Sequence, residues 1–454
     1  MSNIGIENLT IKKATELIRS RALSPVELVQ ACLNRIEQVD DRVKAWVTLV
    51  PDQALDQARQ AEHEILHNQY RGPLHGIPYG AKDIIHTSGI RTSGGSQVEP
   101  DFVPRENATI INKLSSAGAI LLGKTTTTEF AFLGGEPATR NPWNLAHTPG
   151  GSSAGSAAAV SASMAMFALG TQTVGSLLRP ASFNGLSCIK SSYGLVSRRG
   201  VIPASWSLDH LGAFTHTAED NATVLSAMAG YDPQDPASLS VEVPSYADSL
   251  GMLLKGKTIG LPTSFFLAEE PTITQAVEQA VKVLEELGLQ VRKVDLPACL
   301  PEAMASLQIV MRSEAASYHQ AQYSKAPEKF GPYIREQIAL GRQTLAVDYL
   351  QAQRIRTVFR NEMLKLFDTV DILLTPSTLT VAPIGYGTGN PIFNGPFTNA
   401  GLPAMTVPVG FDASNGLPIG MQLVGPMLAE PLLLAVGAQY QAVTDWHLQR
   451  PGLE

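Results

Sequence analysis

The stretch Gly150–Ala181 reads GGSSAGSAAAVSASMAMFALGTQTVGSLLRPA, and the rest of the chain is organised around it. Two Gly/Ser-rich turns, Gly150–Ser153 and Gly170–Ser176, bracket a run of small and apolar residues from which we predict one helix. Glycines let a substrate carbonyl approach the backbone closely, and they permit positive φ angles that aim successive N–H groups at one point. The pattern therefore predicts a binding site for an oxyanion. The alternative is a Gly/Ser loop that only turns the chain.

The same stretch contains several hydroxyl groups but no His, Cys or carboxylate side chain. A reactive serine there would need a base from another part of the chain. Lys82, in the segment GIPYGAKD (76–83), is one such base, because burial in a tight Gly/Pro-punctuated segment favours the neutral amine. Lys124 lies in AILLGKT (119–125), which we predict as a buried strand of the same kind as the apolar segment that leads to Lys82. Spacing alone does not choose between the two lysines. A lone lysine is otherwise interpreted as a solvated surface charge.

Four segments, in this order, closely resemble the amidase signature family of serine hydrolases. They are GIPYGAKD (76–83), TPGGSSAGSAAA (148–159), GTQTVGSLLRPA (170–181) and SLDHLGAF (207–214). The resemblance runs from about residue 7 to residue 445. It implies that a lysine and two serines are catalytic, at Lys82, Ser152 and Ser176. It also favours Lys82 over Lys124, because Lys124 matches a non-catalytic segment of the family.

The resemblance implies a mechanism for this Ser-cisSer-Lys triad. Ser176 attacks the substrate carbonyl, and Ser152 passes the Ser176 proton to Lys82 and later returns one to the departing amine, because a hydroxyl both donates and accepts. Val174 stands where the family often has glycine, and Ser153 is a further residue expected to bind substrate. The expected oxyanion hole consists of the backbone amides of Thr173, Val174, Gly175 and Ser176.

The composition favours one large hydrophobic core. Charged residues make up 17% and hydrophobic residues 44% of the 454 residues, against about 25% charged residues in a typical soluble protein. The formal net charge of −7 argues against a nucleic-acid-binding surface. We therefore expect one amidase-signature domain over residues 1–454 that binds no nucleic acid.

Short apolar segments alternate with helical patterns from Gly76 onward, which predicts an α/β fold. The family resemblance implies a single large fold with a central mixed sheet and helices on both faces. Ser24-Pro25 followed by Glu27 predicts a capped N-terminal helix. We divide the chain into N-terminal helices (about 10–70), a signature core (about 71–230) and a C-terminal part (about 250–445), with a linker at 232–249. A strand–helix–strand pattern over 257–294 is expected at the other edge of the same sheet.

No metal or organic cofactor is expected. Cys32, Cys188 and Cys299 lie far apart and form no CxxC pair, so neither a zinc motif nor a disulfide framework is predicted. The histidines show no metal-ligand spacing such as HExxH. The N-terminus has no secretory signal, and the longest apolar-rich run, Ala154–Leu169, is too short to span a bilayer. We expect a cytoplasmic protein that binds no membrane.

Three functions fit these residues. The leading one is hydrolysis of the C–N bond of a small amide through an acyl-enzyme, in a possible homodimer. The alternative is the amidase component of a tRNA-dependent amidotransferase, which hydrolyses glutamine and passes ammonia to a partner. That branch carries the pattern GTDTGGSIR, whereas Gln172 and Leu178 stand here at the places of its Asp and Arg. The third is a catalytically inactive binding protein, which a complete catalytic set argues against. The sequence does not identify the amide.

Arg179 bears on the choice of substrate. It follows Ser176 by three residues in GSLLRPA. This form resembles malonamidase-type enzymes of the family, in which an arginine at this place faces a substrate carboxylate. If a helical turn begins at Ser176, both residues lie on one face, and the guanidinium could bind a carboxylate in bidentate fashion. The alternative is a structural arginine that pairs with a buried acid or caps a loop, because Pro180 can bend the chain away.

Overall fold

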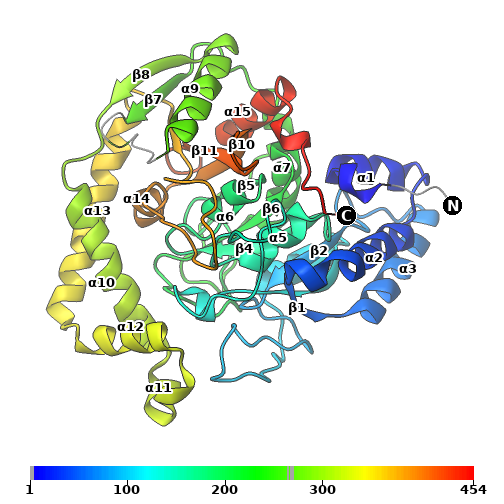
Figure 1. The fold of residues 1–454 in the computed structure, drawn as a ribbon, viewed down its shortest axis with the longest axis horizontal. Helices are drawn as coiled ribbons and strands as arrows, with labels where there is room; N and C mark the ends of the chain where they lie inside the picture. Colours follow the sequence, from blue (N-terminus) through cyan, green and yellow to red (C-terminus); the bar gives the residue numbers. More distant parts are fainter. Residues whose placement is uncertain (1–4, 263–264, 266–269, 454) are drawn as a thin grey trace.

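One mixed sheet of eleven strands runs through the computed structural model, which describes residues 5–262, 265 and 270–453 (Figure 1). The strand order is β1-β3-β2-β4-β6-β5-β10-β11-β9-β7-β8. The strands are β1 (Trp46–Leu49), β2 (Pro78–Lys82), β3 (Ile120–Thr125), β4 (Phe167–Gln172), β5 (Ser187–Lys190), β6 (His210–Thr215), β7 (Thr258–Pro262), β8 (Gln290–Val294), β9 (Ile372–Pro376), β10 (Ala404–Phe411) and β11 (Pro418–Val424). The predicted α/β class with a central mixed sheet is confirmed.

Parallel pairing is confined to two places in the sheet. Strand β2 is parallel to both β3 and β4, and β7 is parallel to both β8 and β9. The remaining neighbours are antiparallel. The strand–helix–strand pattern of 257–294 forms β7, α9 and β8, which occupy the edge of the sheet opposite β1.

Helices cover both faces of the sheet. Gly420 of β11 lies against Ser182 of α6, whereas Met405 of β10 lies against Gly437 of α15. Gly420 pairs with Pro408, three positions along β10 from Met405, and residues at an odd spacing in a strand point to opposite faces. Helices α6 and α15 therefore pack on opposite faces.

Two groups of helices lie on opposite sides of the molecule. Figure 1 shows α1, α2 and α3 beside β1 and β2, and α10, α12 and α13 together on the opposite side of the molecule. The bounds of the helices are α1 (Ile11–Arg19), α2 (Pro25–Val43), α3 (Pro51–Leu66), α4 (Thr109–Ser116), α5 (Ala154–Ser161), α6 (Leu178–Phe183), α7 (Ala218–Met228), α8 (Tyr246–Ser249), α9 (Pro271–Glu286), α10 (Leu300–Tyr318), α11 (Gln320–Lys325), α12 (Pro332–Gln343), α13 (Ala346–Leu366), α14 (Gly395–Asn399) and α15 (Glu430–Ala442). Helix α2 begins with the predicted capping box of Ser24 and Glu27.

The prediction of a single helix between the two Gly/Ser turns is wrong. Helix α5 ends at Ser161, and the chain reverses at Ser163, whose φ is +59°. Strand β4 then runs back between β2 and β6. Both segments are completely buried, so neither has the polar face that would distinguish a helix from a strand by periodicity.

The segment 232–249 is packed against the signature core and is no free linker. Asp232 accepts hydrogen bonds from Thr109 Oγ1 at 2.7 Å and Ser197 Oγ at 2.6 Å. Asp235 pairs with Arg198 at 2.9 Å. The Pro- and Asp-rich composition that suggested a linker instead supplies turn residues and buried carboxylates that hold the segment down.

Gly155 gives a test of how tightly the core around α5 is packed. A Cβ at this position would lie 2.3 Å from Ala45 O and 2.4 Å from Thr126 N, both backbone atoms. Gly155→Ala is expected to lower the free energy of unfolding by about 1–3 kcal/mol, because the added methyl group would displace the backbone of Ala45, just before β1, and of Thr126, just after β3. Chemical denaturation would measure the loss.

Gly251→Ala is the matched control for that substitution, because no atom lies within 4 Å of a Cβ at Gly251. Equal stability of the two variants would contradict the packing at Gly155.

Candidate active site

Lys82 is the last residue of β2. Because β2 and β4 are parallel, both strands end on the same side of the sheet. Its Nζ donates to Ser152 Oγ and to Thr171 Oγ1, both at 2.8 Å. Ser152 lies in the turn before α5, and the Gly151–Ser152 peptide bond is cis. Three segments that are far apart in sequence therefore meet at one amine.

The surroundings of Lys82 favour its neutral form. The side chain is fully buried, and burial lowers its pKa to about 7, although the charge of Asp209 acts in the opposite direction. Since an unperturbed lysine has a pKa of about 10.4, the folded protein converts it into a base near neutral pH. Among the described residues the amine hydrogen-bonds only to hydroxyl groups, so it is placed to exchange a proton with Ser152.

Ser176 lies in the loop between β4 and α6, and it is 8% exposed. The loop contains the four amides predicted for the oxyanion hole, and its shape is fixed by Gln172 at the end of β4. Gln172 Oε1 accepts from Leu177 N at 2.9 Å and from Leu178 N at 3.1 Å. Thr398 Oγ1 donates to Val174 O at 2.9 Å and accepts from Gln172 Nε2 at 2.8 Å.

The sequence did not reveal this anchoring. Gln172 stood out only as a departure from the amidotransferase pattern, and Thr398 lies 226 residues further along the chain. A side chain whose hydrogen bonds all go to backbone and to a distant threonine leaves no local signal. Val174 is not among the described residues with positive φ, so the valine fits the loop without the conformation that favours glycine.

Ser153 ties the two Gly/Ser turns together. Its Oγ donates to Thr171 O at 3.1 Å and accepts from Thr171 N at 3.3 Å. The side chain is fully buried. Both interactions of the hydroxyl go to backbone, so its observed role is to hold the turn of Ser152 against the end of β4.

Arg179 contacts the turn that contains Ser152. Its Nη2 donates to Gly151 O at 2.6 Å, while Nε and Nη1 are buried without a hydrogen-bond partner among the described residues. Burial lowers the pKa of the guanidinium to about 9, which still leaves it charged at pH 7. Between residues 5 and 453, the described parts of the chain place no carboxylate in an ion pair with Arg179. A structural ion pair therefore has no support in the described structure, whereas the hydrogen bond to Gly151 O fits the alternative of an arginine that caps a loop.

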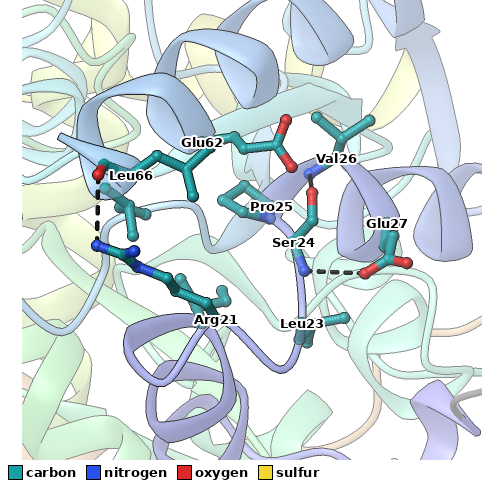
Figure 2. A pocket seen from close by; sticks show the side chains of 10 residues that line it. Arg21, Leu23, Ser24, Pro25, Val26, Glu27, Glu62 and Leu66 are labelled. Carbon is teal, nitrogen blue, oxygen red and sulfur yellow. Dashed lines mark hydrogen bonds between the residues drawn. The ribbon is translucent and has the colours of Figure 1, made fainter.

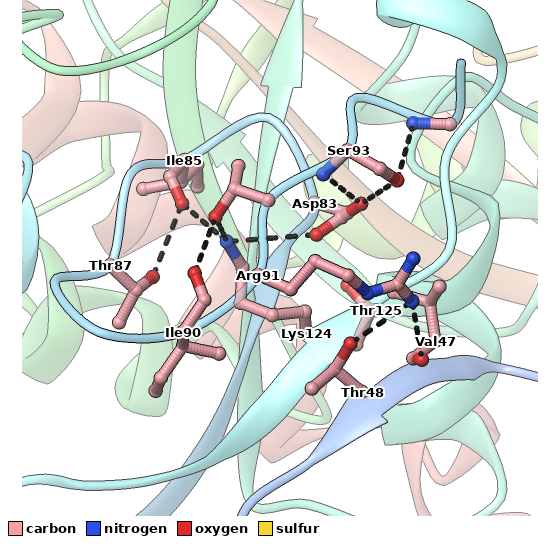
Figure 3. A network of polar contacts seen from close by, with 12 residues as sticks. Val47, Thr48, Asp83, Ile85, Thr87, Ile90, Arg91, Ser93, Lys124 and Thr125 are labelled. Carbon is pink, nitrogen blue, oxygen red and sulfur yellow. Dashed lines mark hydrogen bonds and ion pairs between the residues drawn. The ribbon is translucent and has the colours of Figure 1, made fainter. Parts of the chain in front are cut away.

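The rival lysine, Lys124, belongs to a separate polar network (Figure 3). Its Nζ donates to Ile85 O at 2.5 Å and Thr92 Oγ1 at 2.7 Å, and it lies 3.7 Å from Asp83 Oδ1. Asp83 Oδ2 accepts from the backbone N and the Oγ of Ser93. These contacts fasten the loop after β2 to β3, and none of them reaches Ser152.

Other hollows and clusters lie away from this site. Figure 2 shows a cavity of about 340 Å³ near the N-terminus of α2 and the end of α3, whose lining includes Arg21, Pro25, Glu62 and Leu66. Among the described residues, no group of three or more His, Cys, Asp or Glu side chains could hold a metal ion. No helix in the described part of the chain is long and apolar enough to cross a membrane.

Known proteins are similar to this chain over nearly its whole length. The family model described as Amidase matches residues 27–434. The A-subunit of glutamyl-tRNA(Gln) amidotransferase from Geobacter sp. (strain M21) is 39% identical over 486 residues, which cover 99% of this chain and 100% of the relative.

Two solved structures share the whole fold. One, from work on a vestigial protein complex and the evolutionary origins of an s-triazine catabolic enzyme, has a TM-score of 0.89 at 28% identity, covering 96% of this chain and 98% of that one. The peptide amidase PAM, in complex with the competitive inhibitor chymostatin, has a TM-score of 0.85 at 30% identity, covering 97% and 98%.

Proposed function

Because the chain belongs to the amidase signature family, we propose that it hydrolyses the C–N bond of a small amide that carries a carboxylate, through an acyl-enzyme on Ser176. The observation that carries the proposal is the hydrogen bond of 2.8 Å from the buried Lys82 amine to Ser152 Oγ. A lysine with a pKa of about 7 beside a serine is the base that such a reaction requires.

In the proposed reaction, the Oγ of Ser176 forms a bond to the amide carbon while its proton passes to Ser152 and a proton of Ser152 passes to Lys82. The oxyanion is held by backbone N–H groups of the loop at 173–176, each such donor being worth roughly 3–4 kcal/mol in studied hydrolases. Lys82 returns a proton through Ser152 to the nitrogen, and the C–N bond breaks. Water then attacks the acyl ester by the same route, which regenerates Ser176.

The carboxylate of the substrate is proposed to bind Arg179. A buried guanidinium has five N–H donors, and the described structure supplies one acceptor, Gly151 O. Leaving such donors unpaired away from water costs free energy. A substrate carboxylate would offset that cost next to the turn that holds Ser152.

The second function is that of the amidase component of a tRNA-dependent amidotransferase, in which the ammonia passes to a partner. The relative named as an amidotransferase A-subunit, matched over its full length, supports this function better than it supports a stand-alone amidase. The loop at 173–176 supports the first function instead. Gln172 replaces the Asp of the glutamine-using pattern, and both the Oε1 and the Nε2 of its side chain form hydrogen bonds that shape this loop. Both functions share the acyl-enzyme and differ in the fate of the ammonia. The predicted homodimer stays a prediction.

Ammonia release from a panel of amides tests the proposal and separates the two functions. Monoamides of malonic and succinic acid should be hydrolysed with a lower KM than the corresponding neutral diamides. Arg179→Ala should raise KM for the acids about 10-fold or more, since a charge-assisted contact is worth about 1.5–3 kcal/mol, and change KM for the diamides little. Equal losses on both classes would point to a structural arginine.

Activity on glutamine that appears only with an added partner would favour the amidotransferase, and no turnover of any amide would favour a binding protein.

Ser176→Ala should abolish turnover while keeping the fold, because it removes one hydroxyl at small volume cost. Rapid quench followed by mass spectrometry of the unsubstituted protein should locate the acyl group on Ser176. Ser226→Ala is the control, because it removes a hydroxyl whose hydrogen bond stays within α7 and leaves the site unchanged. An adduct on Ser152 or Ser153 would refute the assignment.

The activity should fall as the pH decreases through about 7, the folded pKa of Lys82. The neutral amine is the reactive form, so kcat/KM should be level above this value and decrease about tenfold per pH unit below it. Initial rates in buffers of constant ionic strength would define the decrease of kcat/KM on the acid side of the pH profile, its acid limb. Full activity in Lys82→Ala, or a level profile down to pH 5, would contradict the proposed base.

A further inference from the structure

Asp209 lies beside the active site at a position that the proposed triad does not use. It directly precedes β6, in the segment SLDHLGAF. Strands β4 and β6 are antiparallel, with Thr171 opposite Leu211 and Gln172 opposite His210. This register brings Asp209 opposite Thr173, the first residue of the oxyanion loop, and close to Thr171, which binds Lys82.

The carboxylate of Asp209 is held by three hydrogen bonds. Oδ1 accepts from Thr173 Oγ1 at 2.6 Å, and Oδ2 accepts from the backbone N of Ala204 and of Ser205, each at 3.0 Å. The residue is 6% exposed. Both oxygens are therefore fixed in place, and one of them fixes the start of the oxyanion loop.

The other charges that face Asp209 have partners of their own. Arg198 pairs with Asp235 at 2.9 Å. Glu314, on α10, accepts from Ser207 N at 3.1 Å and from Tyr349 OH at 2.8 Å. Lys82, in contrast, has only hydroxyl partners in its hydrogen bonds with the described part of the chain, and Asp209 is the acid whose charge raises the pKa of Lys82 against the effect of burial.

We propose that Asp209 is a positioning residue that fixes the oxyanion loop through Thr173 and supplies the negative charge that stabilises Lys82 when it accepts a proton. This inference rests on the proposed function, in which Lys82 receives the Ser176 proton through Ser152. The proton creates an ammonium ion in a buried site, and a fixed opposite charge lowers the energy of that state. Asp209 keeps its three hydrogen bonds and takes no proton in the step.

The pH profile of Asp209→Asn separates the charge from the hydrogen bond. Without the charge, Lys82 should lose its proton more easily, so the acid limb of kcat/KM should move to lower pH by about one unit, and kcat on the plateau should fall because Lys82 is a weaker base. Thr173→Val removes the hydrogen bond and keeps the carboxylate. It should reduce kcat roughly 10- to 100-fold through a displaced loop with a much smaller shift of the limb.

Asp220→Asn is the matched control for the loss of a buried carboxylate. Asp220 is fully buried, accepts hydrogen bonds from Ile11 N and Lys12 N, and has a pKa raised by burial to about 6, as has Asp209. Its substitution should leave the acid limb in place. An unshifted limb in a folded Asp209→Asn protein, or an equal shift in Asp220→Asn, would overturn the proposal.

A measurement without turnover keeps this test apart from the proposed function and from poor folding of Asp209→Asn. In the Ser176→Ala protein, the ¹³C chemical shift of the Asp209 carboxyl carbon should be followed as the pH changes. Besides the inflection from the titration of Asp209 itself, it should show a second inflection near pH 7, where Lys82 titrates. Lys82→Met should remove that inflection. Its absence before the substitution would overturn the coupling of the two groups, even if Ser176 proves to be the nucleophile.

Discussion

The amine of Lys82 is buried away from water, and within the described structure only the hydroxyls of Ser152 and Thr171 bind it. The rest of the site depends on this constraint. Hydroxyl groups stabilise an ammonium ion less than water does, so burial favours the neutral amine and lowers its pKa to about 7. The fold maintains the constraint because β2 lies between β3 and β4, and all three strands are completely buried. A lysine at the surface of the same sheet would remain charged and could not act as a base at neutral pH.

The path of the chain between the two serines explains how Ser152 and Ser176 come to the same edge of the sheet. Helix α5 begins directly after the turn of Ser152 and leads away from it, and β4 leads back to the loop of Ser176. Ser153 then joins the two ends by binding both backbone groups of Thr171. The close approach of Gly155 to Ala45 O and Thr126 N holds the start of α5 down. The small residues of this stretch thus serve packing as much as chemistry, since larger side chains would force the turn away from Lys82.

The sequence predicted the elements whose signals are local. The capping box before α2 and the apolar strand at β3 lie where the pattern placed them, and the motifs selected Lys82 over Lys124, which the structure places in a different network. The helix and strand within 154–172 could not be separated, because a completely buried stretch of small residues has no polar face to reveal its period. Gln172, Thr398 and Asp209 escaped prediction for a different reason. Their roles come from partners that only the sheet pairing and the C-terminal segment bring into contact.

Arg179 reconciles two observations that favour different functions. Its guanidinium stays charged at pH 7, has Gly151 O as its one acceptor among the described residues, and packs through its Cδ against Gly389, where a Cβ would lie 2.9 Å away. A small anion would stabilise a buried cation in this state. Glutamine and the monoamides of small dicarboxylic acids both carry a carboxylate, so the proposed contact of Arg179 with a substrate carboxylate is compatible with both proposed functions. What distinguishes the two functions is the route that ammonia takes after the C–N bond breaks, and that route depends on a partner surface and leaves the catalytic groups unchanged.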